Sequence, residues 1–175
     1  SAASDVYKRQ TLPNDGVAYG RLLVRGPWII KKYFKSEESA VDADNWFDTG
    51  DISSIDPDGY MAIVDREKDV IKSGGEWISS IDLENVIANH PDVLQTAVVG
   101  IPHPKWDERP LLFIVSNSGN EFDRSELDDL MLEKFEKWQL PDDVVFLKEL
   151  PIGATGKVKK IDLRQEYTDH YMKEA

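Results

Sequence analysis

The stretch SSIDLENVIANHPDVLQTAVVGI, residues 79–101, places an amphipathic helix directly before a strand. Ser79 is a suitable helix N-cap because its hydroxyl can accept a hydrogen bond from a first-turn amide, and Asp82 follows three residues later. Pro91 ends the helix, whose apolar residues recur at helical spacing: Leu83, Val86 and Ile87. Residues 94–101 are then rich in apolar side chains, which indicates a buried strand.

The alternation of helix and strand continues toward the C-terminus. Residues 111–116 predict a second buried strand, separated from the first by a long polar loop over 102–110. A second helix is expected over 123–138, with Asp123 and Glu126 as a capping box. Its inner stripe is Leu127, Leu130, Met131, Phe135 and Trp138. A third strand and a last helix are expected over 143–150 and 161–167. These elements predict a compact α/β or α+β unit.

The first part of the chain is mostly β in its pattern. Residues 18–34 have the β-branched and aromatic content of one or two strands, and a polar helical stretch is expected over 35–44. The turn signal DPDG, residues 56–59, lies between two alternating runs and predicts a hairpin over 49–66. Residues 1–10 have no signal-peptide core and are interpreted as a leader or tag.

Composition excludes several classes of function. The net charge of −12 argues against a nucleic-acid-binding protein, which needs a basic face to replace counterions. The dense basic run GKVKK, residues 156–160, is in its simplest interpretation a solvated surface. The chain has no cysteine, which excludes disulfides and thiolate metal sites and fits a cytoplasmic protein. No metal-ligand spacing and no apolar run long enough to cross a membrane occurs, so neither a metal site nor a transmembrane segment is expected.

Four motifs occur in an order that carries a resemblance to a known family. The chain from about Gly20 to Tyr167 resembles the adenylate-forming superfamily, which includes acyl-CoA synthetases, aryl-CoA ligases, firefly luciferase and the adenylation domains of peptide synthetases. Within it, IKSGGEWISSIDLE at 71–84 looks most like medium- and long-chain fatty-acyl-CoA ligases. The motifs are GRLLVRGPWIIKKYF (20–34), WFDTGDISSIDPDGYMAIVDREKDVIKSGGEWISSIDLENVI (46–87), AVVGIPHPKWDERP (97–110) and LPIGATGKVKKIDLR (150–164).

The resemblance implies a ligase that works in two steps. A carboxylic acid first attacks ATP to give an acyl-adenylate and pyrophosphate, and coenzyme A then takes the acyl group. Asp51 is expected to bind both ribose hydroxyls of the nucleotide, because a carboxylate can accept two hydrogen bonds from a cis-diol. Arg66 would contact the ribose and phosphate region, with magnesium arriving on ATP. Lys157 would be the catalytic residue that bridges the substrate carboxylate and the α-phosphate.

The same resemblance assigns residues to domain rotation and to coenzyme A. Lys68 falls at the hinge position, where a small C-terminal domain turns between the two half-reactions. The residues expected along the pantetheine arm of coenzyme A are Lys72, Ser73, Gly74 and Gly75, since glycines let backbone groups lie against a thin chain. Several relatives carry arginine or glutamine where this chain has Trp77, so Trp77 is assigned to the acyl or pantetheine path, with packing in the core as an equal alternative.

The predicted fold class is therefore α+β, in three parts: a leader (1–10), the β-rich C-terminal end of a large AMP-binding domain (11–65), and a small α/β lid domain with a short sheet and about three helices (66–175). Family members are several hundred residues long, so the isolated chain is expected to be an inactive fragment, and its parent could form a homodimer. A fatty acid is the expected substrate, with thioether and aryl acids left open. The alternatives are a nucleotide- or CoA-binding module without chemistry, and an adenylation domain that delivers to a carrier protein.

Overall fold

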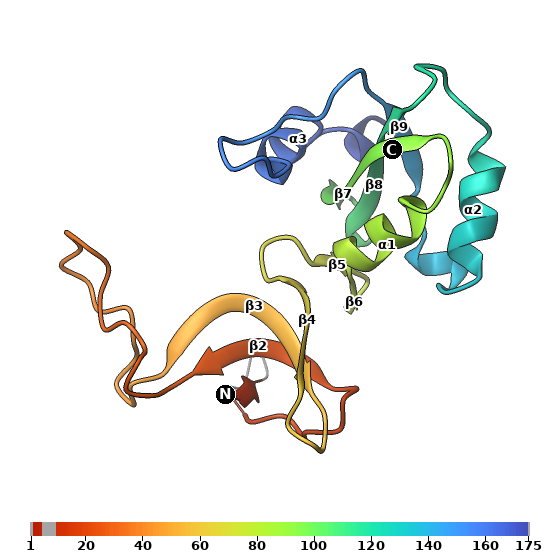
Figure 1. Ribbon diagram of the computed structural model, residues 1–175. Coiled ribbons are helices and arrows are strands. Elements are labelled where there is room, and N and C mark those ends of the chain that lie inside the picture. The colour runs from red at the N-terminus through yellow and green to blue at the C-terminus, as the bar shows by residue number, and fades with distance from the viewer. Residues whose placement is uncertain (1, 5–9, 175) are drawn as a thin grey trace. The chain divides into compact units, whose positions relative to one another are not determined.

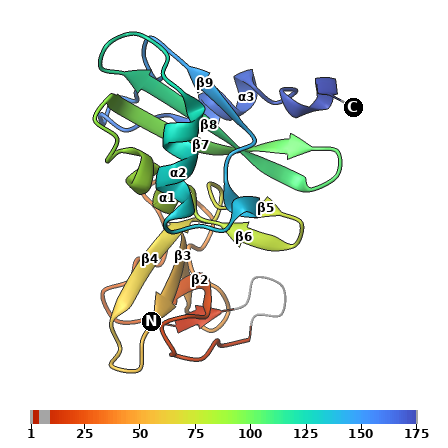
Figure 2. The same cartoon turned by 90° about the vertical axis from the view of Figure 1, so that its right-hand side faces the viewer.

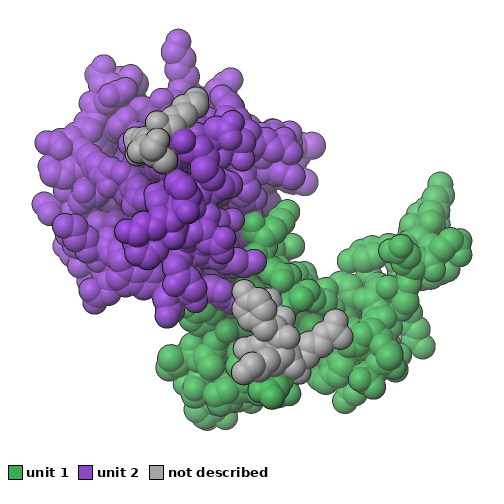
Figure 3. All heavy atoms as spheres, turned by 180° about the vertical axis from the view of Figure 1, so that it is seen from behind, with its two compact units in different colours: residues 1–68 green, residues 69–175 purple. Residues whose placement is uncertain are grey.

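The computed structural model describes residues 2–4 and 10–174 and divides the chain into two compact units, residues 1–68 and 69–175 (Figure 3). Of residues 1–10, interpreted as a leader, residues 1 and 5–9 lie outside the described residues, whereas Ala2–Ser4 form a strand that pairs with residues 21–23; the leader interpretation stays a prediction. The assignment of residues 11–65 to the end of a larger AMP-binding domain stays a prediction.

Unit 1 is built on one antiparallel sheet in the order β1-β2-β3-β4 (Figure 1). The strands are β1 (Ala2–Ser4), β2 (Tyr19–Val24), β3 (Phe47–Ile55) and β4 (Met61–Arg66). The predicted hairpin is confirmed, because Ile55 pairs with Met61 and the Gly59 amide donates to the Asp56 carbonyl at 3.0 Å. One or two strands were expected within residues 18–34, and the structure has one there, β2.

The helix predicted over 35–44 is wrong, since that segment contains no helix. Its serines and aspartate bind nearby backbone amides instead. The Ser36 hydroxyl accepts from the Glu38 amide at 3.1 Å, and the Asp42 carboxylate accepts from the Trp46 amide at 2.8 Å. Such local hydrogen bonds compete with the helical pattern, which explains why a polar, helix-like composition gives a loop here.

Unit 2 contains a five-stranded sheet in the order β6-β5-β8-β7, with β9 parallel to β8 (Figure 2). Its strands are β5 (Ile71–Ser73), β6 (Glu76–Ile78), β7 (Val93–His103), β8 (Asp107–Ser116) and β9 (Asp143–Phe146). The long loop predicted over 102–110 is wrong, because β7 and β8 continue through most of it as one hairpin. The His103 ring accepts from the amides of Lys105 and Trp106 at 3.1 and 3.2 Å, and this closes the short turn.

Three α-helices and two 3-10 turns complete unit 2. They are α1 (Ser80–Ile87), α2 (Arg124–Leu132), η1 (Lys137–Gln139), α3 (Lys160–Glu166) and η2 (Tyr171–Glu174). Ser79 caps α1 as predicted, with its hydroxyl accepting from the Asp82 amide. Asp123 caps α2 through the Ser125 amide, but the helix ends well before residue 138. The Gln139 side chain accepts from the Glu136 amide at 3.0 Å, which starts the separate turn η1.

The sheet of unit 2 is buried on both faces. Leu112 and Ile114 of β8 belong to the core under α1 and α2, whereas Leu111 and Phe113 belong to the core under α3. Side chains alternate between the two faces of a strand, so a strand covered on both sides needs apolar residues at every position. This explains the continuous apolar run in the sequence, and the α+β fold class is confirmed.

Tyr171 fastens the C-terminal turn η2 to the sheet and provides a test of the packing. Its hydroxyl donates to the Pro110 carbonyl at 2.8 Å, and burial, with Asp142 and Asp143 nearby, raises its pKa. We expect Tyr171→Phe to lower the free energy of unfolding by about 1 kcal/mol at neutral pH. Because the folded-state pKa is raised, the stabilisation is complete below the unfolded-state pKa of about 10 and is lost as the pH rises further. The difference in the free energy of unfolding between wild type and Tyr171→Phe, measured with urea, should therefore be smaller above pH ~10 than near neutral pH.

Tyr60→Phe is the matched control, because Tyr60 is 76% exposed. An equal effect of the two substitutions would contradict the role given to the buried hydroxyl.

Candidate functional site

Asp51 and Arg66, the two residues predicted to bind the nucleotide, lie together in unit 1. They face each other across the β3–β4 ladder, and Arg66 Nε lies 2.7 Å from Asp51 Oδ1. The Asp51 side chain is only 17% exposed, whereas that of Arg66 is 56% exposed. A fixed carboxylate therefore sits beside a guanidinium that solvent or a ligand can reach. Their roles in binding stay predictions.

The residues before Asp51 hold its backbone in place. The Thr49 hydroxyl donates to the Leu22 carbonyl and accepts from the Asp51 amide, both at 3.1 Å. Gly50 has a φ of +72°, a left-handed conformation that favours glycine, and its amide donates to Asp48 Oδ1 at 3.0 Å. Asp48, Thr49 and Gly50 therefore shape the chain before Asp51, within an irregular part of β3.

Arg21 is a residue of this region that the sequence did not reveal. It forms an ion pair with Asp48 and lies 3.3 Å from the Glu67 carboxylate. Arg21 is on β2, many residues before its partners, so only the pairing of β2 with β3 brings them together. It connects the segment before Asp51 with the residue after Arg66.

The division between the two units falls directly after Lys68. Lys68 is exposed, and the next residue, Asp69, is held in unit 2 by Arg164 of α3 at 3.4 Å. The role of Lys68 as a hinge stays a prediction.

The β5–β6 hairpin of unit 2 carries the residues predicted to line the path of coenzyme A. Ser73 is buried, and Gly74 and Gly75, both exposed and with positive φ, form the connection. Lys72 and Trp77 pair across the hairpin and therefore share one face of it. Trp77 is partly buried and is not among the residues of the two apolar cores, and its assignment to the acyl or pantetheine path, or to packing, stays a prediction.

Gly74 lies against the ring of Trp106. Its amide donates to the Trp106 carbonyl at 2.9 Å, and a Cβ at this position would lie 3.3 Å from the Trp106 ring. With a φ of +60° as well, the position suits glycine, because any side chain would meet both backbone strain and the indole. The glycine loop is therefore held close to an aromatic surface.

A cavity of about 380 Å³ opens beside this loop. It is lined by Ser73, Gly74, Glu76, Trp106, Arg109, Trp138 and Asp142. Trp106 and Trp138 are each 44% exposed, so two indoles are available at its walls. Trp138 was predicted to lie on the inner stripe of α2, and this is wrong, because the chain leaves the helix before it. Trp106 and Arg109 were missed because they fall in the segment interpreted as a polar loop.

Lys157 lies on a tight turn before α3. Ile152 and Val158 form a β-bridge, and the Gly153 amide donates to the Lys157 carbonyl at 2.8 Å. The Lys157 side chain is exposed, and it makes no ion pair with the residues that the structure describes. In contrast, Lys159 pairs with Asp162 at 2.6 Å and Lys160 with Glu84 at 2.7 Å. The basic run is therefore divided between two anchored lysines and one that extends into solvent.

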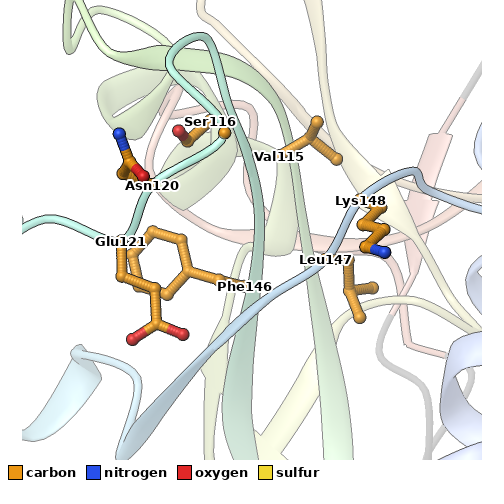
Figure 4. A pocket seen from close by; sticks show the side chains of 8 residues that line it. Val115, Ser116, Asn120, Glu121, Phe146, Leu147 and Lys148 are labelled. Carbon is orange, nitrogen blue, oxygen red and sulfur yellow. The ribbon is translucent and has the colours of Figure 1, made fainter.

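A second cavity, of about 280 Å³, lies where β8 and β9 end (Figure 4). Its lining includes Phe146, Glu121 and Lys148 and none of the predicted site residues. Among residues 2–4 and 10–174, no group of three or more histidine, aspartate or glutamate side chains could hold a metal ion. Within the same ranges, no helix has the length and apolar character needed to cross a lipid bilayer.

Comparisons with known proteins show which proteins this chain is similar to. Residues 82–157 match the AMP-binding enzyme C-terminal domain. The chain is 53% identical to a 3-methylmercaptopropionyl-CoA ligase of Ruegeria lacuscaerulensis over 90% of its own length and 29% of the relative's. It is 49% identical to a long-chain-fatty-acid–CoA ligase of Thermus thermophilus, over 91% of this chain and 30% of that one.

A solved structure gives the same result. The ATP-bound MatB of Rhodopseudomonas palustris has a TM-score of 0.85 and 30% sequence identity, and the match covers 97% of this chain and 34% of that one. The chain thus spans about 30% of the length of the curated relatives it matches. The chain is therefore similar to proteins named as CoA ligases over their C-terminal part, and its residues 82–157 match the AMP-binding enzyme C-terminal domain.

Proposed function

We propose that this chain is the nucleotide-handling C-terminal part of an ATP-dependent acid–thiol ligase. The complete enzyme would activate a carboxylic acid as an acyl-adenylate and transfer the acyl group to coenzyme A. The observation that carries the proposal is the pairing of Asp51 with Arg66 in a chain that also presents an exposed lysine at position 157, which forms no ion pair with the described residues. ATP and coenzyme A are then substrates, with magnesium bound mainly by ATP phosphate oxygens.

For the first step, the chain supplies a carboxylate and two cations. Asp51 would accept hydrogen bonds from the ribose hydroxyls, and Arg66, which is more exposed, would approach the ribose and phosphate region. Lys157 would lie between the substrate carboxylate and the α-phosphate, where a positive charge offsets the repulsion of two anions in the transition state. Lys68 would be the point about which unit 2 turns before the second step.

For the second step, the cavity beside Ser73 and Gly74 would receive part of coenzyme A. Its indoles, Trp106 and Trp138, offer flat apolar surface, and the carboxylate of Glu76 disfavours a phosphate. The uncharged pantetheine arm or a base ring therefore fits this cavity better than a phosphate group. Lys72 and Trp77 pair on the other face of the hairpin from Ser73 and Glu76, and with Gly75 they would contact coenzyme A outside this cavity.

The acid is proposed to be a medium- or long-chain fatty acid. Relatives named as medium- and long-chain-fatty-acid–CoA ligases, 47% and 49% identical, support this choice. The 53% identity to 3-methylmercaptopropionyl-CoA ligases favours a short thioether acid as the second candidate. A panel of acids supplied to the full-length protein would separate the two. A cytoplasmic homodimer is the proposed setting of that protein.

The proposal can be tested with a hybrid ligase, in which this chain replaces the matching C-terminal segment of the Ruegeria lacuscaerulensis relative. With 3-methylmercaptopropionate, ATP and coenzyme A, we expect the hybrid to form the thioester and release pyrophosphate. The isolated 175-residue chain should form none, because it covers only 29% of that relative. The relative with its own C-terminal segment is the control.

A folded hybrid without ATP-dependent pyrophosphate release would refute the proposal. If the isolated chain nevertheless bound AMP or coenzyme A, a binding module without chemistry would replace it.

A further inference from the structure

Arg109 is a buried arginine at the base of the cavity in unit 2, and it is 8% exposed. Its guanidinium forms a two-pronged pair with Asp142, with Nε 2.8 Å from Oδ2 and Nη2 2.6 Å from Oδ1. Nη2 also donates to the Leu140 carbonyl at 3.0 Å. Nη1 donates to the Trp138 carbonyl at 2.7 Å and to the Ser73 hydroxyl at 3.0 Å.

These five hydrogen bonds use every N–H of the guanidinium. No donor remains for a phosphate or carboxylate of a ligand. Arg109 is therefore not a ligand-binding cation, although it lines the cavity. Whatever it contributes to binding must act through the groups that it holds.

Those groups come from separate segments that line the cavity. Ser73 belongs to β5 and begins the Gly74 loop that lies on Trp106. Trp138 belongs to η1, which follows α2 in the chain. Because the guanidinium is planar and rigid, one group bound to both walls fixes the distance between them. Replacing it would leave Asp142 without its cation and two carbonyls and a hydroxyl without their donors.

We propose that Arg109 is a positioning residue that sets the separation of the Gly74–Trp106 wall from Trp138, and thereby the affinity for coenzyme A. This rests on the proposed function, in which the cavity receives part of coenzyme A. The groups that Arg109 binds belong to Ser73, Trp138, Leu140 and Asp142, none of which is proposed for the first step, so acyl-adenylate formation should not depend on it. Without Arg109 the Gly74–Trp106 wall and Trp138 would each still form, but the distance between them would no longer be fixed.

The test compares Arg109→Met and Arg109→Lys with Arg124→Met. Arg124 anchors the same segment by donating to the carbonyls of Pro141 and Asp142, both at 2.6 Å, but its own side chain does not line the cavity. In the hybrid ligase, Arg109→Met should raise the KM for coenzyme A by roughly tenfold or more, since small misplacements of a bound group can cost up to about 100-fold. Its rate of acyl-adenylate formation should stay unchanged.

Arg109→Lys should not restore the KM for coenzyme A, because lysine cannot form the two-pronged pair with Asp142. Arg124→Met should lower thermal stability and leave the KM unchanged.

Asp142→Asn provides a second variant in case Arg109→Met does not fold, and it should raise the KM for coenzyme A less than Arg109→Met does.

In the 175-residue chain, nitrogen-15 spectra of the indoles give a readout that needs no ligand. The Trp106 and Trp138 signals should move in the Arg109 and Asp142 variants, and those of Trp28 and Trp46 should not. An unchanged KM and unchanged indole signals in folded variants, or the same changes in Arg124→Met, would overturn the inference. An inactive wild-type hybrid would refute the proposed function alone, since the indole signals would still report on positioning.

Discussion

Replacing Lys157 with alanine is expected to slow acyl-adenylate formation by about 100- to 1,000-fold in the hybrid ligase. The reason is electrostatic. In the proposed reaction the substrate carboxylate meets the α-phosphate, and removing the ammonium between them leaves the charge of the transition state without its nearest counterion. Pyrophosphate release in a single turnover measures this step. Thioester formation from acyl-adenylate supplied ready-made should change little, because that step does not bring the two anions together.

The local structure makes this substitution a clean one. Lys157 is exposed and makes no ion pair within the described part of the chain, so its removal costs the fold no partner. Lys157→Arg keeps the positive charge and should recover part of the rate. Lys159→Ala is the matched control, since Lys159 lies two residues away and pairs with Asp162 at 2.6 Å. If Lys159→Ala slowed adenylation as much as Lys157→Ala, the general charge of the turn would matter and the catalytic assignment would be wrong.

The elements that local sequence could predict are those in which neighbouring residues decide the structure. Ser79 caps α1 through a residue three positions away, and the hairpin of β3 and β4 is set by its own turn. The failed predictions concern competition between local and distant partners. The segment 35–44 has helical composition, yet its side chains bind their own backbone. Residues 102–110 are polar, yet β7 and β8 extend through them because each strand pairs with the other.

The site follows the same rule. Asp51 and Arg66 are close in sequence and lie in a motif that resembles a family, so they could be named in advance. Arg21 and Arg109 could not, because each acts on residues that only the fold brings near it. An arginine in a polar stretch looks exposed in a sequence, whereas its burial depends on carbonyls and carboxylates from other segments. No residue that binds the acid could be named in advance, and the chain spans only about 30% of the length of its relatives.

Replacing Asp51 with alanine is expected to raise the KM for ATP about 100-fold in the hybrid ligase. The carboxylate would accept hydrogen bonds from two ribose hydroxyls, and the loss of such charge-assisted bonds costs about 3 kcal/mol, which corresponds to roughly 100-fold in affinity. The fold should tolerate the change, because the partner left behind, Arg66, is 56% exposed and can be hydrated. Asp51→Asn, which keeps one acceptor oxygen, should have a smaller effect.

A nucleotide without ribose hydroxyls separates direct contact from a change in the shape of β3. If Asp51 binds the diol, wild type should bind 2′,3′-dideoxy-ATP about 100-fold more weakly than ATP, whereas Asp51→Ala should hardly distinguish the two. Asp48→Ala disturbs the same segment, since Asp48 accepts from the Gly50 amide at 3.0 Å, but it should keep the full preference for ATP. A preference for ATP that survives in Asp51→Ala would mean that the diol is bound elsewhere. Asp51 would then serve only to pair with Arg66, and the nucleotide site proposed for unit 1 would have to be abandoned.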